Sequence, residues 1–230
     1  MAFLPPKKSL IHLVLLSLAC LALSACDARQ PVGCDPAPGA DCRNANLRFK
    51  DLRKTDLAGI NLAGADLSHA MLRHANLQGA NLQGADLSYA DLQYADLRTA
   101  DLRQAQMRRA HLEHTLLKHA DLSAIKAEQV VFSVADLQFA KLKGADLRDA
   151  DLRGADLANA NLQNALLNNA RLEKANAKGA NFTGARLNNA ALYGTLLEDA
   201  TWTDGSRCAH GSISRCKPAE QQPAATASQP

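Results

Sequence analysis

Three histidines within nine residues are the side chains whose types and spacing come nearest to a metal site. His111, His114 and His119 form the densest imidazole cluster in the chain, and Asp91 lies twenty residues before His111. Imidazole and carboxylate groups are common zinc ligands. The period described below places His119 around a corner from the other two, so we expect solvated histidines and predict no metal and no cofactor. A metal-binding protein of the cell envelope stays open as an alternative.

No other group of residues suggests catalysis. The aspartates recur because a short motif repeats them, and the serines occupy solvent positions without a fixed histidine and aspartate. The sequence has no glycine-rich loop of the kind that binds phosphate. We therefore expect that the protein is not an enzyme.

Leucine recurs at every fifth residue, a period that neither a helix nor a flat strand can use. In a helix successive leucines would step by roughly 140°, and in a strand they would alternate between faces. An alanine two residues before each leucine shares its side in an extended chain. The chain must therefore run extended for about three residues and bend, and regular bends close it into a coil.

The phase of this period never slips between Leu47 and Trp202. Of the 32 central positions, 26 are leucine, and the position two residues earlier is alanine in 25 of the 32 units. The residue before the leucine is usually Asp or Asn, and the two residues after it are polar. Alanine and leucine therefore face the core, and the other three positions face water.

The motif A-(D/N)-L-x-x, as in Ala65-Asp66-Leu67 and Ala145-Asp146-Leu147, resembles the pentapeptide-repeat family. The resemblance covers about 160 of the 230 residues. It implies an all-β fold, a right-handed quadrilateral β-helix with four units per coil. The 32 units would then make about eight coils, a rod about 38 Å long at the usual strand spacing.

The N-terminus has the features of a bacterial export signal. Lys7 and Lys8 precede an apolar run, Leu10 to Ala25, that is shorter than a membrane span. It ends in Leu23-Ser24-Ala25-Cys26, which resembles the lipobox of bacterial lipoproteins, and this resemblance implies acylation of Cys26. Cleavage near Ala25 with a plain Cys26 thiol and an uncleaved membrane anchor are the alternatives. We expect a periplasmic protein anchored by lipid to the inner or the outer membrane.

Four further cysteines flank the repeats in two pairs, each eight residues apart: Cys34, Cys42, Cys208 and Cys216. Three connectivities are conceivable for four cysteines in an oxidising compartment. If the rod implied by the resemblance keeps its ends about 38 Å apart, only pairing within each end is feasible. The ends are then stapled by disulfides. A metal site is the less favoured interpretation, because His210 is the only histidine near either pair.

The charge balance disfavours one function known in the family, which stays as an alternative. Some members are known to imitate DNA and modulate a type II topoisomerase, which calls for an acidic surface. Residues 43–204 carry 20 basic and 19 acidic side chains, and the chain after Cys26 carries 24 and 23. This balance and the export signal disfavour DNA mimicry. The net charge of +1 in the chain after Cys26 predicts no nucleic-acid partner.

Residues twenty apart stack in a coil of four units, and two such columns carry large side chains in the first half of the rod. One column contains Phe49, His69, Tyr89 and Arg109, and its neighbour contains Lys54, His74, Tyr94 and His114. We predict a contact strip for an envelope protein or a glycan. The alternative is that the columns only stabilise the sheet.

One stretch, Ala124 to Ala135, keeps the spacing but changes the residue types. Phe132 could fill room left by Ala127 in the core, which is the favoured interpretation. Alternatively, exposed Val131 and Val134 would form a docking patch.

The predicted organisation is a signal peptide (1–25), a tether and N-terminal cap (26–44), the β-helix (45–204), a C-terminal cap (205–216) and a disordered tail (217–230). The expected function is a protein-binding or structural module tethered to the envelope membrane. End-to-end pairing of two copies stays open.

Overall fold

The computed structural model describes residues 34–218. The predicted signal peptide, Cys26 and residues 219–230 of the tail lie outside the described residues. Within residues 34–218 there is no helix long and apolar enough to cross a membrane. β-pairing there takes the form of single bridges at every fifth residue rather than extended strands.

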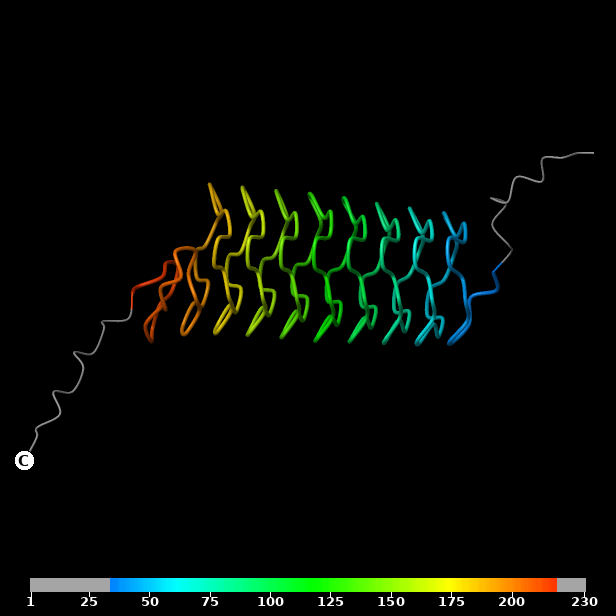
Figure 1. The fold of residues 1–230 in the computed structure, drawn as a ribbon, viewed down its shortest axis with the longest axis horizontal. Helices are drawn as coiled ribbons and strands as arrows, with labels where there is room; N and C mark the ends of the chain where they lie inside the picture. The colour runs from blue at the N-terminus through cyan, green and yellow to red at the C-terminus, as the bar shows by residue number, and fades with distance from the viewer. Residues whose placement is uncertain (1–33, 219–230) are drawn as a thin grey trace, which may run out of the picture. The chain divides into compact units, whose positions relative to one another are not determined.

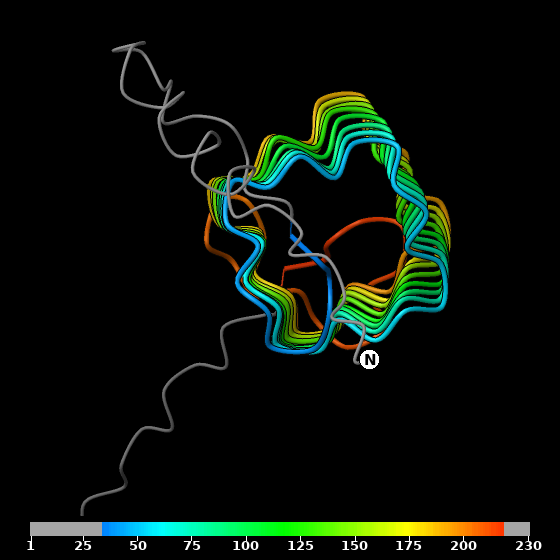
Figure 2. The same ribbon diagram turned by 90° about the vertical axis from the view of Figure 1, so that its right-hand side faces the viewer.

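These bridges define a coil of twenty residues. Asp41 pairs in parallel with Asn61, and the same offset recurs at every fifth position up to Asn181 and Thr201. Four five-residue units therefore complete one turn of the chain. Figure 1 shows the turns of the coil side by side, and Figure 2, along the axis, shows their four-sided outline. The predicted four-sided β-helix is confirmed.

A single unit shows why the coil is stable without long strands, since all five of its amide groups have acceptors. Leu87 and Tyr89 donate to the next coil, at the carbonyls of Gln106 (2.7 Å) and Arg108 (2.9 Å), and Asp86 donates to the previous coil at 2.9 Å. Ala85 donates within a turn at 3.0 Å. The Ser88 amide donates to Oδ1 of Asp86 at 2.9 Å. Where an Asp or Asn precedes the leucine, its side chain can thus accept the bond that the backbone cannot accept, as Asp86 does.

Each corner of the coil is a tight turn whose third residue has a positive φ. In the turn from Leu87 to Ala90, the Ala90 amide donates to the Leu87 carbonyl at 3.0 Å, and Tyr89 has φ 61°. A positive φ at this position alone is typical of a type II turn, which favours glycine or asparagine. Gly84 and Gly144 occupy the same position in other units at φ 65° and 67°. The side chain of the third turn residue, such as Tyr89, therefore points outward at a corner of the coil.

The core is a narrow column of leucine and alanine, closed along its length by the backbone. Most of these side chains have no exposed surface at all. Twice a central alanine is followed five residues later by a fully buried phenylalanine, as Ala127 by Phe132 and Ala177 by Phe182. A large ring beside a small side chain keeps the filled volume nearly constant. Val134 is 54% exposed at the corner after Phe132.

The two ends of the described rod differ. At the start, Cys42 occupies a central position and is buried, one unit before Leu47. At the other end the chain reverses, and Ile213 and Arg207 pair antiparallel with Leu196 and Thr201. The reversed segment covers the faces around residues 196–202. The Leu187 and Leu192 amides have no acceptor among residues 34–218.

The structure brings the cysteines together within each end, as the rod requires. The Cα atoms of Cys34 and Cys42 lie 5.4 Å apart, and those of Cys208 and Cys216 lie 4.9 Å apart. Both distances fall within the range that a disulfide spans.

Replacing Asp86 by alanine should lower the free energy of unfolding by about 1 kcal/mol, because the Ser88 amide loses its acceptor. Asp86→Asn keeps an acceptor oxygen at Oδ1, now an amide oxygen, and should stay near the wild type. Urea denaturation measures both changes.

Gln106 lies one coil further in the same column and accepts no such bond within residues 34–218. Gln106→Ala is therefore the matched control and should change stability little. An equal loss in the two alanine variants would show that the acceptor does not matter.

Candidate functional site

The residues of the predicted strip form two columns of stacked side chains along neighbouring corners. In the first corner column, Phe49 stacks on His69 and His69 on Tyr89, each with ring centroids 4.9 Å apart. The Arg109 guanidinium carbon lies 6.0 Å from the Tyr89 ring centre. The second corner column, which begins at Lys54, contains His74, Tyr94 and His114. Its successive centroids are 5.0 and 4.8 Å apart.

Stacking determines which parts of these rings a partner can reach. Neighbouring rings in each column are within 19° of parallel, so most ring faces are covered by the next ring. Phe49, Tyr89 and Tyr94 are nevertheless 60%, 41% and 44% exposed. The accessible surface is therefore mainly ring edges and the tyrosine hydroxyl groups. Binding of a sugar against a ring face requires a free face, which suits this surface poorly.

The fold does not require bulky residues at these corners. His69, Tyr89 and Tyr94 have φ values of 59°, 61° and 61°, where a side chain adds strain that glycine avoids. Ring stacking between coils offsets part of this cost.

The face between the two columns is polar and internally bonded. Arg73 donates to Oε1 of Gln93 at 2.8 Å and lies 3.5 Å from the Asp91 carboxylate. Its guanidinium carbon is 5.8 Å from the Tyr94 ring centre. Arg73 thus links neighbouring coils of this face and holds Tyr94 in position.

Several aspartates on the surface are neutralised by an arginine two residues later. Six units contain this Asp-Leu-Arg or Asp-Cys-Arg arrangement, with Asp and Arg side chains on the same face: Asp41–Arg43, Asp51–Arg53, Asp96–Arg98, Asp101–Arg103, Asp146–Arg148 and Asp151–Arg153. In the second pair, Arg53 Nε and Nη2 donate to the two Asp51 oxygens at 2.8 and 2.6 Å. These hydrogen bonds lower the pKa of Asp51 to about 2. Each of these aspartates is thus paired within its own unit.

The three clustered histidines make three different contacts. The Nδ1 atom of His111 lies 3.3 Å from the Glu113 carboxylate, and His114 stacks on Tyr94. His119 stacks on Phe139 with centroids 5.0 Å apart. Among residues 34–218, no group of three or more potential ligands is placed to hold a metal ion. The His119–Phe139 stack was missed in the sequence, although its offset of twenty would have identified it.

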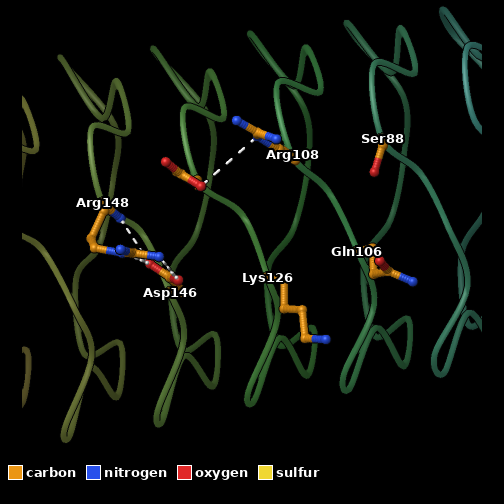
Figure 3. A pocket seen from close by; sticks show the side chains of 7 residues that line it. Ser88, Gln106, Arg108, Lys126, Asp146 and Arg148 are labelled. Carbon is orange, nitrogen blue, oxygen red and sulfur yellow. Dashed lines mark hydrogen bonds and ion pairs between the residues drawn. The ribbon is translucent and has the colours of Figure 1, made fainter.

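A shallow depression of about 260 Å³ lies on another face, lined by Ser88, Gln106, Arg108, Lys126, Glu128, Asp146 and Arg148. Figure 3 shows the paired Arg148 and Asp146 on one coil, with Arg108 directed toward a carboxylate on the neighbouring coil. That contact joins Arg108 to Glu128 at 3.8 Å. Most of the charges here pair with one another, and the depression has no catalytic arrangement among its described residues.

Comparison with known families gives one match. The family described as Pentapeptide repeats matches in eight copies over residues 40–79, 67–104, 131–169 and 160–199. Residues 105–130 lie outside these ranges. There Gln106, His111, Leu116 and Lys126 replace the usual Asp or Asn, yet the bridges continue without a break. No curated protein matches the chain.

Solved structures of repeat proteins are similar to the chain. HetL, a pentapeptide repeat protein involved in heterocyst differentiation regulation in Nostoc sp. PCC 7120, is 33% identical over 74% of this chain and 88% of its own, with a TM-score of 0.34. QnrB1, a plasmid-mediated fluoroquinolone resistance protein, is 15% identical over 73% of this chain and 84% of its own, with a TM-score of 0.57. At 15% identity this likeness concerns the fold alone.

Changing Arg53 to Gln should raise the pKa of Asp51 from about 2 toward the ordinary 3.8, because the side-chain hydrogen bonds are lost. The depressed pKa means that the pair stabilises the fold above pH 3.8 and that this stabilisation is lost as the pH falls toward 2. Carboxyl NMR titration measures the shift. The control is Arg103→Gln, in another pair, which should leave the pKa of Asp51 unchanged. If Arg53→Gln also left the pKa of Asp51 unchanged, its low value would be assigned to the hydrogen bond from the backbone amide of residue 53.

Proposed function

Because the chain belongs to the pentapeptide-repeat family, we propose that it is a non-enzymatic rod that binds a partner or supports structure in the bacterial envelope. In this proposal an acylated Cys26 anchors the rod to the inner or the outer membrane from the periplasmic side. The rod comprises about eight coils and is closed by a disulfide at each end.

The observation that carries this proposal is the proximity of the cysteines at both ends. Cα distances of 5.4 and 4.9 Å suit disulfides, and Cys42 and Cys208 are buried against the core. Stable structural disulfides are typical of exported proteins and rare in the cytoplasm. Paired cysteines at both ends therefore support the export signal that the sequence indicates.

The surface charge supports an envelope partner over DNA mimicry. A DNA mimic must present carboxylates as an unpaired acidic array. In this rod six surface aspartates are held by an arginine of the same unit. A topoisomerase-modulating protein remains the rival hypothesis, together with a metal-binding envelope protein.

The two corner columns are the proposed contact surface for the partner. Their exposed ring edges, tyrosine hydroxyl groups and imidazoles combine apolar area with hydrogen-bonding groups, as protein interfaces do. Because the ring faces are largely covered by stacking, we favour a protein partner over a glycan.

Globomycin, which blocks lipoprotein signal cleavage, should cause an unprocessed precursor to accumulate in membranes. Cys26→Ser should do the same, because no thiol is left to acylate. Fractionation and mass spectrometry of the N-terminal peptide measure both effects. Fully soluble cytoplasmic protein that inhibits DNA supercoiling by a purified topoisomerase would establish the rival function.

Tyr89→Ala and Tyr94→Ala should each reduce recovery of the partner in an in-cell cross-linking experiment about tenfold, the scale expected for a central interface tyrosine. Tyr193 is 76% exposed and lies in the last coil outside both columns. Tyr193→Ala is therefore the matched control and should retain the partner. Equal recovery in all three variants would reject the strip.

A further inference from the structure

Three cations of the first coil differ from most of the surface arginines because no carboxylate among the described residues holds them. Arg43 and Arg53 pair with aspartates of their own units. Within residues 34–218, Arg48, Lys50 and Lys54 form no ion pair. All three lie close together in the sequence and are exposed. Residues 45–64 carry four cations, Arg48, Lys50, Arg53 and Lys54, against two carboxylates, Asp51 and Asp56, so the first coil keeps a net charge of +2.

An exposed aromatic ring lies between two of these cations, Arg48 and Lys50, in the sequence. Phe49 is 60% exposed, and the Arg48 guanidinium carbon lies 4.9 Å from its ring centre. The nearest acidic side chain in sequence, Asp51, is occupied by two hydrogen bonds from Arg53. Phe49 and Lys54 lie at the two neighbouring corners where the corner columns begin, and we call Arg48, Phe49, Lys50 and Lys54 together the first-coil corner.

Lys50 breaks the repeat in a way that core packing does not explain. Its position is the inward one that Ala70 and Ala90 fill in the next two coils, where both are fully buried. Lys50 is instead exposed. A lysine in a core position must bring its ammonium group back to water, so here it adds charge to the N-terminal end of the rod.

The first-coil corner also lies at the end of the rod that an acylated Cys26 would tether. Cys26 precedes Cys34 by eight residues, a stretch that spans at most about 28 Å. Cys34 and Cys42 meet at the first coil, with Cα atoms 5.4 Å apart. The far end of the rod lies about 38 Å further along the axis at the usual strand spacing. The first coil is therefore the part of the rod that must stay near the membrane.

We propose that the first-coil corner docks on the anionic phospholipid headgroups of the membrane that holds the anchor. This proposal rests on the proposed lipid anchor and adds that the rod has a fixed contact with the bilayer. Basic side chains around an aromatic ring are the combination that binds the interface of an anionic membrane. Docking would set the orientation of the rod and so the direction in which the rest of the corner columns, from His69 and His74 onward, face the partner.

The test uses the full acylated chain, purified from membranes and reconstituted in vesicles. The natural chain has one tryptophan, Trp202, in the last coil. Phe49→Trp places a second tryptophan in the first-coil corner. In vesicles of phosphatidylglycerol with brominated phosphatidylcholine, the fluorescence of this introduced tryptophan should be quenched and shifted to shorter wavelength. In brominated phosphatidylcholine alone it should not, and Trp202 should remain unquenched in both.

Charge reversal identifies the cations responsible. In the Phe49→Trp protein, Lys50→Glu and Lys54→Glu should each lower the docked population about fivefold. Lys174 lies in the same column as Lys54, toward the other end of the rod, and is also exposed with a positive φ. Lys174→Glu is the matched control and should leave quenching unchanged. High salt should reverse the docking.

The outcomes separate this proposal from the proposed function. A chain that fails to float with either vesicle type lacks the anchor, so the proposed function fails. A chain that floats while the introduced tryptophan is unquenched, or equally quenched without phosphatidylglycerol, overturns headgroup docking alone. Cross-linking of the first-coil corner to an acidic protein in place of lipid would also overturn it.

Discussion

Backbone hydrogen bonds between consecutive coils fix the position of every other group in this structure. In each regular unit, two amides donate to the next coil and one to the previous coil, as Leu87, Tyr89 and Asp86 do. Since these bonds join residues about twenty apart, each side-chain position lies over the same position of the neighbouring coil. The core, the corner columns and the ion pairs all follow from that register.

The register has different consequences inside and outside. Inside, it places Leu over Leu and Ala over Ala, so one change of size must be offset nearby, as with Ala127 and Phe132. Outside, it stacks any side chain on its counterpart at the rung spacing. Phe49, His69 and Tyr89 form a continuous stack for this reason, and no separate packing arrangement is needed.

The variation between one unit and the next therefore lies mainly at the external positions. In units with Asp-Leu-Arg, the arginine neutralises the aspartate. Units with glycine at the corner expose little more than backbone atoms there. Departures from the usual Asp or Asn are concentrated in residues 105–131, where Asp121 alone keeps this position acidic, and in residues 166–201. The backbone register continues through both regions, so the rod tolerates functional variation on its surface.

The sequence by itself determined the period and the inward and outward positions, since five residues set one extended stretch and one bend that repeat many times. The four-unit coil, and with it the two columns of large residues, followed from the resemblance to the pentapeptide-repeat family. Only the tertiary structure decided that the rings cover one another's faces and that Asp51 is held by Arg53, while Arg48, Lys50 and Lys54 form no ion pair within residues 34–218. It also showed that the C-terminal segment reverses over Leu196 and Thr201. These features depend on side-chain conformations and on contacts between coils, which composition and spacing along the chain do not specify.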